Sequence, residues 1–162
     1  EAWDYTSRNA VVLAGGSTTI TGPDGLVRIE DLVTTLTEDA TGNPESAWRF
    51  VETILNIQTK IYQLDVTFGA SPFDRAIVVD NASTTQKAYA IRPNTVKSFA
   101  IQLVDNWINE AWSRERDSIV SGIQAEIDPV NPGRINLLVP DVIAAGLKVM
   151  AVKYEWAFQP AQ

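Results

Sequence analysis

The sequence contains no cysteine and no histidine. Without histidine, the chain cannot form a Ser-His-Asp triad, an imidazole general base or a His-ligated zinc site. Without cysteine, it has no thiolate nucleophile, no disulfide and no Cys-ligated iron–sulfur cluster. Any catalysis would have to use carboxylate, hydroxyl, Lys, Arg or Tyr side chains, so most common enzyme classes are disfavoured.

Basic residues are scarce as well. The 162 residues include 13 Lys and Arg against 20 Asp and Glu, which gives a net charge of −7. Sequence-independent binding of nucleic acid needs a basic stripe, so no nucleic-acid partner is expected. Residues 1–45 hold eight of the acids and only two bases, a net of −6. This acidic part is either a solvated surface that keeps the protein soluble or a patch that faces a basic partner.

Long apolar runs are also missing. No stretch reaches the roughly 18 consecutive apolar residues of a membrane span, and the first residues do not resemble a signal peptide. We therefore expect no membrane partner. The length of 162 residues is typical of one domain.

The first third of the chain is predicted to form a helix and a β-hairpin. The helix covers Asp4–Leu13 and ends at a glycine pair, where glycine can adopt a positive φ. The hairpin strands Thr18–Thr21 and Leu26–Ile29 flank the turn Gly22–Gly25. Because β-branched residues continue beyond it, the second strand is expected to extend to Leu36.

Two longer helices are predicted next. Asn43 and Pro44 are typical of a helix cap and a first helical residue, so a helix is expected from Pro44 to Val66. Residues 76–79 are expected to form a short strand, and a second long helix is expected over Pro93–Trp112. One face of this second helix is predicted to lie in the core: Val96, Phe99, Ala100, Leu103, Trp107 and Ala111.

The last third is predicted to form strands over residues 118–127, 134–139 and Leu147–Phe158, with a proline-containing turn at 128–133. The predicted fold class is therefore α+β, with a mixed, largely antiparallel sheet packed against two long helices and with an N-terminal helix and β-hairpin. Residues 1–162 are expected to form a single domain.

No arrangement of side chains predicts a catalytic, cofactor-binding or metal-binding residue. The glycines match neither phosphate-binding loop pattern. Glu30-Asp31 and Glu38-Asp39 are adjacent pairs, and neighbours on a strand point to opposite faces, so neither pair converges on an ion. One alternative that stays open is a carboxylate-based metal-binding or hydrolase domain that uses Asp24, Glu30, Asp31 or Glu38. Another is a carbohydrate- or protein-binding module that presents Trp3, Trp48 or Trp112.

The C-terminal predicted strand is unusually apolar for a chain end. One of its faces carries Val152, Tyr154, Trp156 and Phe158. These side chains either fill the domain's own core or belong to a strand that pairs with the sheet of another subunit. They are therefore the candidate intersubunit contacts.

Three blocks of sequence resemble the C-terminal part of contractile tail sheath proteins of Mu-like bacteriophages and prophages. The first block is residues 7–35, with Gly25-Leu26-Val27-Arg28-Ile29-Glu30-Asp31-Leu32 at its centre, and the second is Val51-Glu52-Thr53-Ile54. The third runs from Asp128-Pro129 through Arg134-Ile135-Asn136 to Pro140-Asp141, and continues as Leu147–Trp156. None of these blocks is a chemical motif, and residues 71–92 match poorly.

The resemblance implies a structural, non-enzymatic role without a cofactor. The chain would be the C-terminal domain of a longer sheath subunit, part of a helical tube that surrounds the tail tube and contracts to drive it through the host envelope. Terminal arms of one subunit would add strands to its neighbours. The implied partners are other sheath subunits, the tail tube protein, and the baseplate and tail terminator proteins. The implied location is the virion, with the host cytoplasm during assembly.

Overall fold

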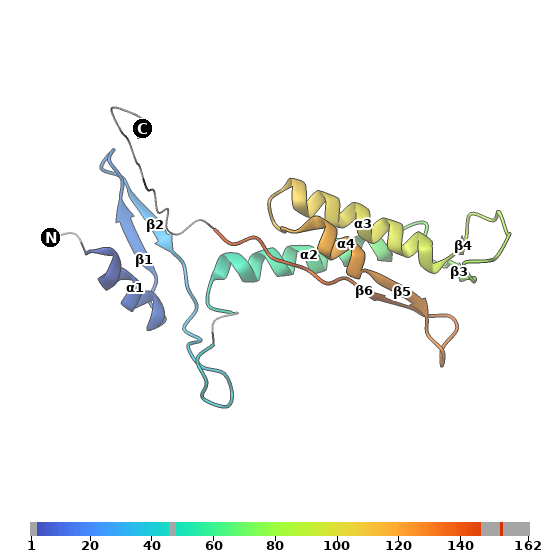
Figure 1. The fold of residues 1–162 in the computed structure, drawn as a ribbon, viewed down its shortest axis with the longest axis horizontal. Coiled ribbons are helices and arrows are strands. Elements are labelled where there is room, and N and C mark those ends of the chain that lie inside the picture. The colour runs from blue at the N-terminus through green and yellow to red at the C-terminus, as the bar shows by residue number, and fades with distance from the viewer. Residues whose placement is uncertain (1–2, 46–47, 147–152, 154–162) are drawn as a thin grey trace, which may run out of the picture.

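A computed structural model describes residues 3–45, 48–146 and 153 of the chain. Four helices and six short strands occur in these residues, which confirms the predicted α+β class. The strands form three separate two-stranded sheets: β1–β2 and β5–β6 are antiparallel, and β3–β4 is parallel. In Figure 1, α1 and β1–β2 lie at one end, α2 and α3 run side by side through the middle, and β3 and β4 lie at the other end.

The N-terminal prediction is largely confirmed. Helix α1 covers Tyr5–Leu13, and the Asp4 side chain caps it by accepting a 2.7 Å hydrogen bond from the Ser7 amide. Strands β1 (Thr18–Thr21) and β2 (Val27–Asp31) form the predicted hairpin. The predicted extension of the second strand to Leu36 is wrong. The chain instead turns toward α2, where Val33 forms a single antiparallel bridge with Phe50.

Helix α2 covers Val51–Gly69 and begins seven residues later than the predicted start at Pro44. The cause is the Asp39 carboxylate, which accepts hydrogen bonds from the backbone amides of Thr41 and Asn43. These bonds hold a tight loop, and Pro44 then forms an antiparallel bridge with Glu38. The Asn43 side chain also donates within this loop, to the side chains of Asp39 and Thr41, so this residue does not cap a helix.

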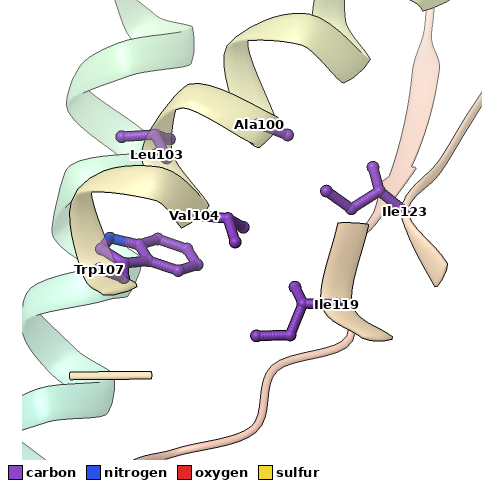
Figure 2. Packing of buried hydrophobic residues seen from close by; sticks show 6 residues of the cluster. All are labelled: Ala100, Leu103, Val104, Trp107, Ile119 and Ile123. Atoms are coloured by element: carbon purple, nitrogen blue, oxygen red, sulfur yellow. The ribbon is translucent and has the colours of Figure 1, made fainter. Parts of the chain in front are cut away.

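Helix α3 covers Pro93–Asn109 and supplies most of the core. Its predicted buried face is confirmed at Val96, Ala100, Leu103 and Trp107, whereas Ala111 is exposed just after the helix end. Figure 2 shows four side chains of α3 packing against two from the segment that follows: Ala100, Leu103, Val104, Trp107, Ile119 and Ile123. This cluster holds the helical part of the chain together.

The segment after α3 differs from its prediction. Residues 116–122 form helix α4 (Arg116–Gly122), where a strand over 118–127 was expected. Ile119 and Ile123 are buried, whereas Ser121 between them is exposed; this pattern breaks the alternation of a strand and fits a helical turn. Strand β5 (Gln124–Ile127) then pairs with β6 (Ile135–Leu138) across the predicted turn.

The short parallel pair lies at the far end from α1. Strand β3 (Ile77–Val78) confirms the prediction for residues 76–79, and its partner β4 (Ala90–Ile91) directly precedes α3. No described helix is both long enough and apolar enough to cross a membrane. The predicted strand Leu147–Phe158 lies outside the described residues, except for Lys153.

Candidate functional site

The two faces of the β1–β2 hairpin have different surroundings. Residues that face each other across an antiparallel pair lie on the same side of the sheet. The Ile20–Arg28 pair therefore shares the side of Thr18 and Glu30, and this side meets α1. There the Arg8 guanidinium donates a 2.7 Å hydrogen bond to the Glu30 carboxylate, which also accepts a bond from the Thr18 hydroxyl.

The opposite side of the hairpin, here called the open face, carries Thr19, Thr21, Val27 and Ile29. Val27 is 68% exposed and Ile29 is 66% exposed, although both are apolar residues of a strand. Side chains of this type in strands normally pack against a second layer. No third strand pairs with β1 or β2 among the described residues. The open face is thus an apolar sheet surface that the described chain leaves uncovered.

The part of the chain that contains the hairpin also has very little core. We call residues 3–45 the hairpin unit. Within it, only Val12, Thr18 and Val33 are buried. A two-stranded hairpin is marginally stable alone and normally needs a further strand or a packed layer. The contacts within the hairpin unit therefore bury too little apolar surface to stabilise it well. This makes it the strongest candidate for a surface that binds another protein chain.

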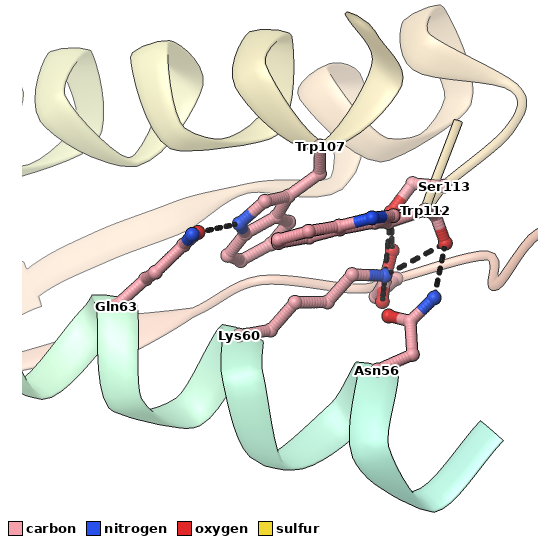
Figure 3. Close-up of polar contacts among 7 residues, drawn as sticks. Asn56, Lys60, Gln63, Trp107, Trp112 and Ser113 are labelled. Atoms are coloured by element: carbon pink, nitrogen blue, oxygen red, sulfur yellow. Dashed lines mark hydrogen bonds and ion pairs between the residues drawn. The ribbon is translucent and has the colours of Figure 1, made fainter. Parts of the chain in front are cut away.

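A second notable feature is a polar cluster between α2 and the segment after β6 (Figure 3). The Lys60 ammonium, in a residue only 4% exposed, lies 2.7 Å from the Asp141 carboxylate and 2.7 Å from the Ser113 hydroxyl. It also donates to the Trp112 carbonyl oxygen at 3.0 Å. The Ser113 hydroxyl donates to the other oxygen of Asp141 at 2.7 Å. We call Lys60, Ser113 and Asp141 the Lys60 cluster.

The bonding of the Lys60 cluster favours a structural role. An ammonium has three donors, and here all three have an acceptor. A serine that a lysine activates donates its hydroxyl proton toward the lysine nitrogen, whereas the Ser113 hydroxyl accepts from Lys60 and donates to Asp141. The cluster instead holds Asp141 and its neighbours against α2 and the segment after α3. Two backbone hydrogen bonds act in the same way, Arg114 N–Val142 O and Ala144 N–Trp112 O.

An apolar cavity of about 240 Å³ adjoins the Lys60 cluster. It lies between α2 and the segment that Asp141 fastens, and its apolar lining consists of Ile57, Ile61, Leu64, Trp107, Val139 and Ile143. Because the polar atoms of Lys60 are already occupied, the cavity offers a ligand little beyond apolar contact.

The carboxylates of the alternative hypothesis are dispersed and paired. Asp24 forms an ion pair with Arg28, and Glu30 forms one with Arg8. In the part of the chain that the structure describes, no three acidic residues gather where they could hold a metal ion. No observation therefore favours a metal or hydrolase site built on these residues.

Asp39 gives a prediction on pH dependence. The Thr41 hydroxyl, and then the amides of Asn43 and Thr41, lower the pKa of Asp39 to about 2 from its usual 3.8. A lowered folded-state pKa stabilises the fold above the unfolded pKa, and the stabilisation is lost as the pH falls toward the folded value. We expect the melting temperature of Asp39→Asn to fall less steeply than that of the wild type between about pH 4 and pH 2. If the melting temperatures of the two proteins fell equally over this pH range, the result would contradict this role of Asp39.

The remaining sequence-predicted residues lie apart from one another. Trp3 and Trp48 are exposed, and Trp112 is half-buried beside the Lys60 cluster. The candidate contacts Val152, Tyr154, Trp156 and Phe158 lie outside the described residues. Sequence reasoning missed the Lys60 cluster, although a lysine within the apolar period of α2 was its available signal.

Comparison with known proteins identifies no family for this chain, because it matches no family model and no curated protein.

Proposed function

We propose that this chain is a domain of a contractile tail sheath subunit in a phage or phage-like particle. In this role it packs in a helical tube around the tail tube, and the tube contracts to drive the tail tube through the host envelope. The proposal combines the resemblance of three sequence blocks with one structural observation: the hairpin unit carries an apolar two-stranded sheet that the described chain does not complete.

An incomplete hairpin suits a part that joins its neighbours by strand addition. Gly22 donates its amide hydrogen to Leu26 at the end of the hairpin ladder. Hydrogen-bonded and non-hydrogen-bonded pairs alternate in antiparallel sheets, so the next pair, Thr21–Val27, directs its amides away from the partner strand. An extended segment of another subunit could accept a hydrogen bond from the outward amide of Thr21 on one edge or of Val27 on the other.

The helical part of the chain suits the second requirement of a contractile sheath, which is subunits that move as rigid bodies. Helices α2 and α3 run side by side over a buried cluster that includes Val104 and Trp107. The Lys60 cluster adds buried polar contacts between α2 and the chain after β6. A contractile sheath needs subunits that are rigid and that stay linked as they move. The packed helices would supply the rigidity, and the uncompleted hairpin would supply the link to a neighbour.

The test uses the longer protein that the resemblance implies. We expect it to sediment as large particles and to appear as hollow tubes in negative-stain microscopy. A full-length protein that stays monomeric and forms no tubes would overturn the proposal.

A second measurement examines the link itself. Proline lacks the amide hydrogen, so Thr21→Pro with Val27→Pro removes an outward donor from each edge of the hairpin. We expect this double variant to lose tubes, while the matched Thr21→Ala/Val27→Ala variant keeps them. Circular dichroism must show that both variants retain the wild-type helix content. Normal tubes from the proline variant would contradict strand addition at this hairpin.

A further inference from the structure

Two uncovered apolar surfaces lie at opposite ends of the described chain. One is the open face of the hairpin unit. The other belongs to residues 70–97, which we call the β3–β4 end. In Figure 1 the strands that carry them, β1–β2 and β3–β4, lie toward the two ends of the long axis, with α2 and α3 between them.

The β3–β4 end offers both apolar side chains and a hollow. Ile77 is 57% exposed and Tyr89 is 53% exposed. Neighbouring residues of the two strands, Val78 and Ile91, line a cavity of about 330 Å³ at the same end. Its apolar lining includes Phe68, Phe73, Val78, Ile91, Ile135 and Leu137. A protruding apolar side chain of a partner could enter this cavity, which the described chain leaves unfilled.

The two ends carry opposite net charge. Residues 3–45 contain seven acids and two bases, a net of −5, whereas residues 70–97 contain four bases and two acids, a net of +2. Arg75 and Lys87 are exposed beside the apolar residues of the β3–β4 end. The Arg92 guanidinium donates to the carbonyl oxygens of Ser83 and Thr85, so those contacts leave its positive charge uncompensated.

We propose that the open face of the hairpin in one copy of this chain binds the β3–β4 end of a second copy. The inference rests on the assembly role proposed above, but it uses the face of the hairpin and not its edges. Two hairpin units placed face to face would bring together two net charges of −5, which disfavours a symmetric dimer. A head-to-tail contact joins opposite charges and two different apolar surfaces.

Another exposed apolar surface, along α2, is a weaker candidate for this contact. It displays Leu55, Ile61, Tyr62 and Val66, and the only basic residue of α2 is the buried Lys60. However, α2 already packs on the core of the protein, whereas the hairpin unit has almost no core of its own. Covering the open face would therefore add more stability than covering the exposed surface of α2, because the hairpin unit has less core of its own.

A head-to-tail contact leaves one free surface at each end, so it generates open chains and not closed dimers. In analytical ultracentrifugation, the weight-average mass of this 162-residue chain should increase as the protein concentration is raised to about 1 mM. It should fall again when the salt concentration increases from about 50 mM to about 500 mM, because exposed charges are then screened.

Two blocked variants test the pairing directly. The face variant Val27→Lys/Ile29→Lys replaces the open face, and the end variant Ile77→Ser/Tyr89→Ser replaces the β3–β4 surface. Each alone should self-associate about tenfold more weakly than the wild type. An equimolar mixture should form a species of twice the monomer mass and nothing larger, because each variant keeps one intact surface. The matched control Leu55→Lys/Tyr62→Lys changes two exposed apolar residues of α2 and should associate like the wild type.

Each other outcome overturns the inference. A wild-type chain that remains monomeric near 1 mM shows that no such contact exists. A mixture of the two variants that stays monomeric shows that the contact is not head-to-tail. Loss of association in the α2 variant alone assigns the surface to α2. The mixing experiment does not depend on tube formation by the longer protein. It therefore tests the head-to-tail contact even if the sheath proposal fails.

Discussion

Replacing Asp141 with alanine should lower the free energy of unfolding by about 3 kcal/mol, because it leaves the Lys60 ammonium buried without its counter-ion. The Lys60 residue is 4% exposed, so water cannot readily replace the lost carboxylate. Chemical denaturation followed by circular dichroism measures the change. A loss below about 0.5 kcal/mol would show that the cluster carries no such penalty.

Two variants make this prediction specific to the buried ion. Lys60→Met removes the charge and should cost less, because the Asp141 carboxylate keeps 22% of its surface exposed. Adding Lys60→Met to Asp141→Ala should recover part of the stability that Asp141→Ala loses. Asp105→Ala breaks an exposed ion pair with Arg116 and serves as the matched control, with an expected cost of about 0–1 kcal/mol.

Replacing Trp107 with alanine should destabilise the protein by about 4 kcal/mol. The side chain belongs to the core cluster and is 2% exposed, so its removal leaves a large cavity in that cluster. It also removes the 2.6 Å hydrogen bond from the indole to Gln63 and the ring that lies 5.3 Å from the Lys60 ammonium. Urea denaturation followed at 222 nm measures the loss.

The matched control for Trp107 is Trp48→Ala. Trp48 is exposed, so its truncation should cost less than about 1 kcal/mol. Equal effects of the two tryptophan variants would mean that the α3 cluster is not the main core. Gln63→Ala separates the contribution of the hydrogen bond from that of the ring, and it should account for the smaller part of the loss.

The elements that could be predicted from the sequence are those whose local signals agree with their contacts. Helix α3 begins at Pro93 and buries an apolar period, and the β1–β2 hairpin follows a Pro- and Gly-containing turn. The cap pattern of Asn43 and Pro44 predicts a start of α2 that is too early, because the Asp39 loop overrides this pattern. A side-chain bond from four residues upstream has no periodicity, so single-sequence reasoning cannot detect it.

The candidate site could be predicted less well than the fold. Lys60 and Asp141 are 81 residues apart, and only the packing of α2 against the chain after β6 brings them together. The exposure of Val27 and Ile29 could not be inferred either, because an apolar strand residue is normally expected to be covered. Sequence periodicity predicts which residues share a face, whereas the layer that covers this face depends on the rest of the fold.

The small core of the hairpin unit has a consequence for the order of folding. Residues 3–45 leave the ribosome before the helical part of the chain, yet they bury only three side chains, so they gain little by folding alone. Their described attachments to the body include the hydrogen bonds Thr34 N–Arg49 O and Val51 N–Leu32 O, which form only when α2 is in place. The hairpin unit is thus expected to fold after the helical part that follows it, and to open in hydrogen exchange before the helices loosen.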